Sequence, residues 1–240
     1  MRKFEIMHKI VFMQSNTSVG LDATVPLTEQ ALLSLRRDVT FGVFEPGQKL
    51  KLEALQTRYG LSSSPLREAL SKLSQEGLVR ADERKGFRVA DISRADLQDI
   101  TRMRLMLDVQ ALQSAMQAGD AEWEATVVAA HYKLDKLERT LPDGPVVLDE
   151  VWVSTHRAFH LAMLGACQSP RLLQWCANLF DQAERYRQFS ARHRKTNRRK
   201  AAEHRRLMET VIKRDIPTAC QLLEDHISST QHNVLTALNL

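Results

Sequence analysis

The sequence predicts a mainly α-helical protein, with an N-terminal winged helix-turn-helix followed by an all-α antiparallel helical bundle. Three observations predict this fold. Three short amphipathic helical segments lie between Leu27 and Gly77, separated by turns that contain glycine. Two short extended segments then flank a charged turn at residues 82–86. From Ser93 onward the sequence has helical periodicity almost throughout and no internal repeat.

Length and composition limit the classes of protein to consider. A chain of 240 residues with 43% hydrophobic and 26% charged residues is typical of one or two globular domains. We expect a poorly ordered leader at residues 1–26, a winged domain at 27–92 and a helical domain at 93–240. No apolar run approaches the roughly 18 residues that span a bilayer, so we expect no membrane association. The three cysteines are odd in number and lie in helical segments, which favours reduced thiols in a cytoplasmic protein.

The first two helical segments have the lengths expected of a helix-turn-helix. Leu27–Gly42 places leucines and Val39 on one face of a helix. Phe44–Lys49 contains a Pro-Gly turn. Leu50–Tyr59 is predicted as a second short helix, which Gly60 closes. These segments therefore lead into a third helix across a tight turn.

The third segment, Leu61–Val79, is the expected recognition helix. Pro65 suits the first helical position and Ser64 the N-cap before it. The residues spaced to form one buried stripe are Leu66, Ala69, Leu70 and Leu73. A serine-fronted helix with Arg67 one turn in is suited to enter a DNA major groove by its N-terminus, although an ordinary amphipathic helix has the same pattern.

The wing and the helices before it match a known family. Leu78–Ala81 and Phe87–Ala90 are the two predicted wing strands. The matching motifs are Pro46-Gly47-x-x-Leu50, Gly60, Ser62-x-x-Pro65-Leu66-Arg67-Glu68-Ala69-Leu70, Glu76-Gly77-Leu78-Val79 and Gly86-x-x-Val89. On these motifs, residues 27–92 resemble the winged-helix domain of the GntR transcription regulators.

The resemblance implies that Arg67 and the serines before it contact bases or phosphates, while the wing reaches the minor groove. The residues expected to contact double-stranded operator DNA are Lys51, Ser62, Ser63, Ser64, Arg67, Arg84, Lys85 and Gly86. The family usually has Arg at the position of Ser63 and a basic residue at that of Glu53, so two of its contacts are absent here. Basic residues nearby, Lys51 among them, could supply the missing charge.

Positive charge is concentrated outside the predicted DNA-binding domain. The net charge of the chain is +5, with only +4 in residues 1–90 but +10 in residues 185–214. The basic stretch Arg192–Arg206 could add phosphate contacts or bind an anionic ligand. The alternative is a solvated helix end or loop.

Six helical segments are predicted after residue 92. They are Ser93–Ala118, Asp120–Thr140, Val146–Ala166, Pro170–Gln188, about Arg198–Arg214, and Asp215–Leu238. Ser93 and Asp215 are the expected N-caps of the first and the last of these segments. Because the connections are short, neighbouring helices should pack antiparallel.

Four histidines could converge inside this bundle. His156 and His160 are four residues apart and therefore share one helix face. His204 and His226 each lie 11 residues from Asp215, where the last two helices turn. At 1.5 Å per residue, an antiparallel hairpin sets both about 16 Å from the turn. The four imidazoles could bind one metal ion, and the alternative is that each is an ordinary hydrogen-bonded histidine.

A second resemblance supports the metal interpretation. The matching motifs are Arg104-x-x-x-Asp108, Phe159-His160-x-Ala162, Glu203-His204 with Ile212 and Asp215, and His226. On these, residues 93–236 resemble the helical effector domain of FadR-type GntR regulators, many of which hold a metal with one Asp and three His. Here His156 stands where that Asp is usual. An all-imidazole set favours Zn²⁺ or Ni²⁺ over Mn²⁺ or Mg²⁺.

The effector implied by this resemblance is a small carboxylate. Arg104 occupies the family's ligand-clamping position and could bind a carboxylate in a bidentate manner, or it could instead pair with Asp108. Asp99 and Arg102 are weaker candidates for effector contact. Leu172–Arg187, together with Asp120–Ala125, also resembles a repressor of γ-aminobutyrate and glutarate catabolism, which suggests a dicarboxylate.

We therefore predict a homodimeric DNA-binding transcription regulator, a repressor rather than an activator, that responds to a metabolite. One alternative is a metal-dependent enzyme on a helical bundle. Against it, the sequence shows no paired carboxylates at general acid–base spacing near the histidines, and no Gly-rich phosphate loop. The other alternative is a non-specific nucleic-acid binder that acts through Arg192–Arg206.

Overall fold

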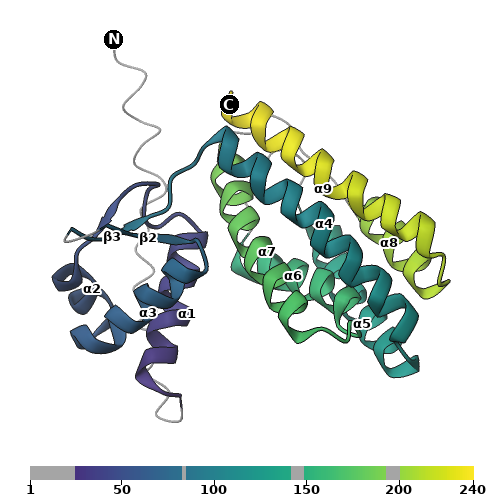
Figure 1. The fold of residues 1–240 in the computed structure, drawn as a ribbon, viewed down its shortest axis with the longest axis horizontal. Helices are drawn as coiled ribbons and strands as arrows, with labels where there is room; N and C mark the ends of the chain where they lie inside the picture. The colour runs from purple at the N-terminus through teal and green to yellow at the C-terminus, as the bar shows by residue number, and fades with distance from the viewer. Residues whose placement is uncertain (1–24, 83–84, 142–148, 193–200) are drawn as a thin grey trace.

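The computed structural model describes residues 25–82, 85–141, 149–192 and 201–240. These residues form a small N-terminal part, with helices and a short sheet, and a larger part made of long helices (Figure 1). The leader predicted at residues 1–26 lies almost entirely outside the described residues. Among the described residues no helix is long and apolar enough to cross a membrane.

The N-terminal part is a winged helix-turn-helix, as the sequence predicts. Its elements are α1 (Leu27–Thr40), β1 (Lys49–Leu50), α2 (Leu52–Tyr59), α3 (Ser63–Gln75), β2 (Val79–Asp82) and β3 (Gly86–Val89). The strands pair antiparallel in the order β1-β3-β2. Gly60 has a φ of 66° and closes α2 in the left-handed conformation, where glycine carries no Cβ penalty. The two-residue strand β1 was not predicted, and it occupies the end of the predicted turn and the start of the predicted second helix.

The core of the winged part lies between α1 and α3. The predicted stripe of α3 is fully buried, at 0% exposure for each of Leu66, Ala69, Leu70 and Leu73. Leu35 and Val39 of α1 pack into the same cluster. Burial of this face leaves the opposite face of α3 to solvent, which is the arrangement that a groove-reading helix requires.

The start of α3 differs from the prediction. The helix begins at Ser63, with Ser62 as an extended N-cap whose side chain makes no capping hydrogen bond. Ser64 and Pro65 therefore lie inside the first turn, and the prediction that Ser64 is the N-cap was wrong. Proline is tolerated throughout the first turn because those N–H groups have no partner within the helix, so it does not specify one position there.

The second part is an all-α bundle. Its helices are α4 (Arg94–Ala118), α5 (Ala121–Thr140), α6 (Glu150–Leu164), α7 (Pro170–Ala191), α8 (Ala201–Ile212) and α9 (Ile216–Leu238). The side chains of Ser93, Asp120 and Asp215 each accept a hydrogen bond from the N–H three residues on. This confirms the predicted caps Ser93 and Asp215, and the structure adds Asp120 as a third cap. The helix α6 begins at Glu150, after the cap Asp149, and the predicted start at Val146 lies outside the described residues.

The packing of the bundle positions the histidine-bearing helices. α4 lies between α7 and α9, α5 packs against α6 and α8, and α8 pairs with α9 (Figure 1). The core includes Phe159, Met163, Leu207 and Leu223 from the helices α6, α8 and α9. Because these helices surround one interior, side chains far apart in sequence can meet there.

Candidate metal centre and nucleic-acid interface

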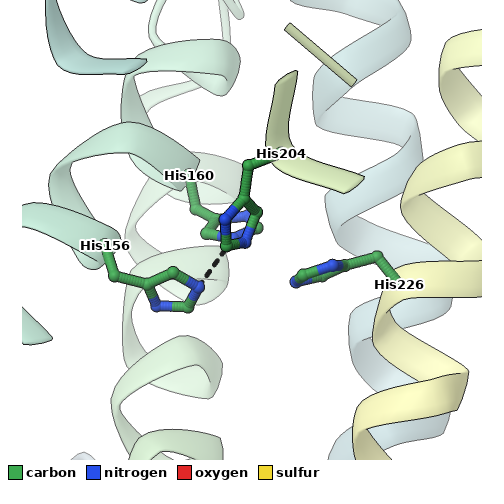
Figure 2. Close-up of side chains that lie close together, drawn as sticks. All are labelled: His156, His160, His204 and His226. Carbon is green, nitrogen blue, oxygen red and sulfur yellow. Dashed lines mark hydrogen bonds between the residues drawn. The ribbon is translucent and has the colours of Figure 1, made fainter. Parts of the chain in front are cut away.

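Four histidines meet in the interior of the bundle. His156 and His160 come from α6, His204 from α8 and His226 from α9, and their rings point toward one another (Figure 2). Each residue is between 1% and 7% exposed. One ligand nitrogen from each lies within 4.8 Å of the others, close enough that a small movement of the side chains would let all four bind one ion. The sequence argument therefore placed these side chains correctly. His156 and His160 share one helix face, and His204 and His226 lie at the same level of the hairpin.

The ring nitrogens that face inward suit a metal better than they suit one another. Nε2 of His160 lies 3.1 Å from Nε2 of His156. Nε2 of His204 is buried and has no hydrogen-bond partner among the described residues. Burial, followed by nearby positive charge, lowers the pKa of His156 and of His160 well below the usual value. Buried neutral imidazoles with inward lone pairs fit a divalent cation.

Aromatic side chains wall the histidine cluster. Trp152 stacks on His156 with ring centroids 4.5 Å apart and an interplanar angle of 16°. Phe180 of α7 lies 5.6 Å from the ring of His156 and 5.5 Å from that of His160. This apolar wall restricts the rotamers of the imidazoles and excludes water from their inner face.

Two carboxylates back the cluster on its outer side. Sequence reasoning missed Glu138, and it noted Glu203 beside His204 without predicting its contact with His226. Nδ1 of His204 lies 3.0 Å from Glu138 of α5. Nδ1 of His226 lies 3.2 Å from Glu203 of α8. Glu203 precedes His204 in sequence, yet it contacts the histidine of the next helix. Both groups contact Nδ1 atoms outside the inner face, so they do not test the expectation that no paired carboxylates lie near the histidines at general acid–base spacing.

Arg104 is buried beside the cluster and pairs with Asp108 at 2.9 Å. The structure therefore has the ion pair that the sequence offered as the alternative to an effector contact. Arg104 also lies over the ring of Phe180, 5.2 Å from its centroid. Both members of the pair line a small cavity with His160, Cys176 and Phe180. The cavity has room for about one water molecule.

The weaker effector candidates lie elsewhere. Asp99 and Arg102 pair with each other at 3.3 Å, and both side chains are about 70% exposed. They take no part in lining the cavity beside Arg104.

The predicted DNA-contacting residues form an exposed set. Those that the structure describes are all exposed: Lys51, Ser62, Ser63, Ser64, Arg67, Lys85 and Gly86. The serines and Arg67 lie at the N-terminal end of α3, whereas Lys85 lies between β2 and β3 and Gly86 begins β3. Ser64 donates a 3.3 Å hydrogen bond to Glu68. Arg84 lies outside the described residues.

The helix α7 joins the two parts of the molecule. Near its middle, Gln182 donates a 2.8 Å hydrogen bond to the carbonyl of Glu76, the residue that ends α3. The buried Arg185 donates to the carbonyls of Ala90 and Asp91 in the connecting segment, at 3.1 Å for Asp91. One turn of α7 therefore contacts the end of the recognition helix and the connection between the parts.

The same turn of α7 also fixes the start of α4. The Tyr186 hydroxyl accepts from the N–H of Ser93 at 3.1 Å and donates to Asp96 at 2.6 Å. Asp181, on the bundle side, pairs with Arg157 of α6 at 2.6 Å. α7 thus connects the helix that carries His156 and His160 to the winged part.

The basic stretch Arg192–Arg206 is engaged at both ends. Arg192 donates to the carbonyls of Phe41 and Gly42 after α1. Arg205 pairs with Asp135 of α5 at 3.0 Å. Residues 193–200 lie outside the described residues.

Comparisons with known proteins agree with this architecture. A family model described as bacterial regulatory proteins, gntR family, matches residues 27–89, and one described as FCD domain matches residues 99–229. The chain is 37% identical over 205 residues to BphR of Paraburkholderia xenovorans, an uncharacterized HTH-type transcriptional regulator, which covers 85% of this chain and 83% of that protein. It is 38% identical over 197 residues to GlaR of Escherichia coli, an HTH-type transcriptional repressor, over 80% of this chain and 89% of that protein.

A solved structure has the same fold. The structure of McbR/YncC from Escherichia coli superposes with a TM-score of 0.74 at 21% identity, and the match covers 90% of this chain and 98% of that one. At this identity the likeness concerns the fold alone.

Proposed function

Because the chain belongs to the GntR family of bacterial regulatory proteins and carries an FCD domain, we propose that it is a homodimeric repressor whose operator binding responds to a small carboxylate held beside a metal ion. That it is a transcriptional regulator and not an enzyme follows from the family and from its relatives. The repressor assignment is supported by the likeness to GlaR, described as a repressor.

The observation that carries DNA binding is the exposed N-terminal end of α3. Ser62, Ser63 and Arg67 are exposed there, while the apolar stripe behind them is buried. An arginine in this position can bind a guanine edge, and the serines can donate to phosphates. Lys85 and Gly86 extend the surface to the wing, as minor-groove contact requires.

Dimerisation is proposed from the size of the reading element. One recognition helix contacts only a few base pairs, so two copies on a pseudo-palindromic site are needed for useful specificity. Light scattering on the purified protein should give twice the chain mass of 27.4 kDa.

The proposed metal centre consists of His156, His160, His204 and His226. Four imidazole nitrogens favour Zn²⁺ or Ni²⁺ among the common divalent ions. A metal there would supply a Lewis-acid anchor for a carboxylate oxygen. Arg104, whose ion pair with Asp108 borders the same cavity, would bind the other end of the effector.

The size of the cavity implies that effector binding changes the bundle. Room for about one water is too little for a dicarboxylate, so the Arg104–Asp108 pair or Phe180 has to move. Phe180 belongs to α7, the helix that contacts the end of α3 and the connecting segment. A shift of α7 would therefore alter how the winged part is held, and a coupling of about 1–3 kcal/mol would be usual.

The proposal is tested by measuring DNA affinity with the full-length protein. Fluorescence anisotropy on a labelled duplex from the chain's own promoter region should give a dissociation constant of about 10⁻⁸ M or tighter. A random duplex of equal length should bind on the order of a thousand times more weakly. Equal affinity for the two duplexes would reject sequence-specific DNA binding and favour non-specific binding through the basic stretch.

A further inference from the structure

The two carboxylates behind the histidine cluster lie where they would set the properties of the proposed metal centre. Glu138 contacts Nδ1 of His204 at 3.0 Å, and its side chain is 6% exposed. Glu203 contacts Nδ1 of His226 at 3.2 Å, and its side chain is 48% exposed. The inference drawn from them depends on the metal centre of the proposed function.

Each of these contacts selects a form of its imidazole. A neutral imidazole that offers Nε2 to a metal carries its proton on Nδ1. A carboxylate oxygen beside Nδ1 accepts that proton's hydrogen bond and so fixes both the tautomer and the ring orientation. The unpartnered Nε2 of His204, which points into the cluster, is the lone pair that Glu138 would orient in this way.

Charge gives a second reason for these contacts. Four neutral imidazoles provide no negative charge, and a buried divalent cation without compensation is costly. The guanidinium of Arg104, which is buried and lines the same small cavity as His160, would add positive charge beside the ion. Two carboxylates one imidazole away would balance the double charge of the ion.

We propose that Glu138 and Glu203 are positioning residues of the metal centre, which orient His204 and His226 and supply the negative charge that the four imidazoles lack. Glu138 has the larger effect because its carboxylate is buried, whereas solvent screens that of Glu203. In the described hydrogen bonds, no carboxylate contacts His156 or His160 of α6. The two carboxylates therefore act only on the ligands from α8 and α9.

The test is a metal-affinity measurement on the full-length protein, stripped of metal and titrated with Zn²⁺ against a chromophoric chelator. Glu138→Gln keeps an acceptor oxygen and removes the charge, and it should weaken Zn²⁺ binding about 10- to 100-fold. Glu203→Gln should weaken it by a smaller factor. Matched controls are Glu122→Gln on α5 and Glu209→Gln on α8, both exposed, which should change the affinity less than about twofold.

A second measurement separates positioning from a merely structural role. Thermal unfolding of the metal-free Glu138→Gln variant should stay close to that of the metal-free wild type, because the amide still satisfies His204. An unchanged Zn²⁺ affinity in a folded Glu138→Gln variant would overturn the inference and leave the metal centre intact. If the wild type itself fails to bind Zn²⁺ or Ni²⁺, the metal centre of the proposed function fails, and this inference fails with it.

Discussion

The two candidate sites of this protein are built in opposite ways. The nucleic-acid surface comes from one continuous stretch, residues 51–86, and its described members are exposed. The candidate metal centre comes from three helices, and its four histidines are buried. The comparison teaches that a surface site can be read from local motifs, whereas a buried site also depends on the residues packed around it. Substitutions on the nucleic-acid surface should alter DNA contacts alone. Substitutions at the buried histidines should alter both metal binding and the packing of the bundle.

The largest effect is expected from opening the core that supports the exposed site. Leu70 is fully buried, so Leu70→Ala should cost about 2–5 kcal/mol of the free energy of unfolding. Its exposed neighbour serves as a control, because Ser71→Ala should change stability by no more than about 0.5 kcal/mol. Chemical denaturation measures both. Equal stability of the two variants would mean that the face assignment of α3 is incorrect.

Removing a proposed metal ligand is the next largest change. His160→Ala should weaken Zn²⁺ binding by more than the roughly 100-fold reached by outer partners, because a donor atom itself is lost. Metal content of the purified protein, determined by mass spectrometry, should fall with it. His232→Ala removes an exposed histidine on α9 and should leave the metal content unchanged. Retention of metal by the His160 variant would remove the four-histidine site.

Removing a proposed base contact should have a smaller effect, and that effect should be confined to DNA binding. Arg67→Ala should cost about 1–3 kcal/mol of operator binding and relax specificity, because a bidentate guanine contact is lost. Arg102→Ala removes an equal charge from an exposed position on α4 and should change operator affinity little. Anisotropy titrations on operator and random duplexes compare the two. If both variants lose affinity equally, charge alone explains the effect and Arg67 does not read sequence.

The link between the two sites is tested at α7. Gln182→Ala removes the hydrogen bond to the end of α3 and should reduce the coupling between effector and DNA by about 0.5–2 kcal/mol. Gln174→Ala, at an exposed position of the same helix, is the matched control. The observable is the ratio of operator affinities with and without a bound carboxylate. An unaltered ratio in the Gln182 variant would show that this contact does not carry the coupling.

The smallest effect is expected from pH. Burial lowers the pKa of His156 and of His160 below that of the unfolded chain, so the unfolded state takes up protons first as pH falls. The free energy of unfolding of the metal-free protein is therefore highest above pH 6.5, and it declines as the pH drops below that value. Between pH 7.5 and 6.5 the loss should be about 0.4 kcal/mol per histidine. Denaturation of the metal-free protein at both pH values measures it, and a gain in stability at pH 6.5 would contradict the sign.

Much of the fold follows from local chemistry. Capping side chains at Ser93 and Asp215 mark two helix starts, and equal distances of 11 residues from Asp215 place His204 and His226 at the same level of a hairpin. The start of α3 was misplaced because proline fits several positions of a first turn. The strand β1 has only two residues, which is too short to show the alternation of apolar and polar residues that predicts a strand.

The surroundings of the buried site could not be predicted in the same way. Glu138 lies 66 residues from His204, and no spacing rule connects α5 to α8. The contacts of Gln182 and Arg185 cross between the two parts over about 100 residues of sequence. Such pairings depend on how helices pack, which periodicity within one helix does not specify.

The central claim is that the buried centre controls the exposed surface, and operator affinity measured as a function of metal and carboxylate tests it most directly. The dissociation constant for the operator should differ by about 5- to 150-fold between the Zn²⁺-loaded protein with a bound dicarboxylate and the metal-free protein. The same additions should leave the affinity of His160→Ala unchanged. Identical operator affinity of the wild type in both states, with Zn²⁺ shown to be bound, would contradict the account.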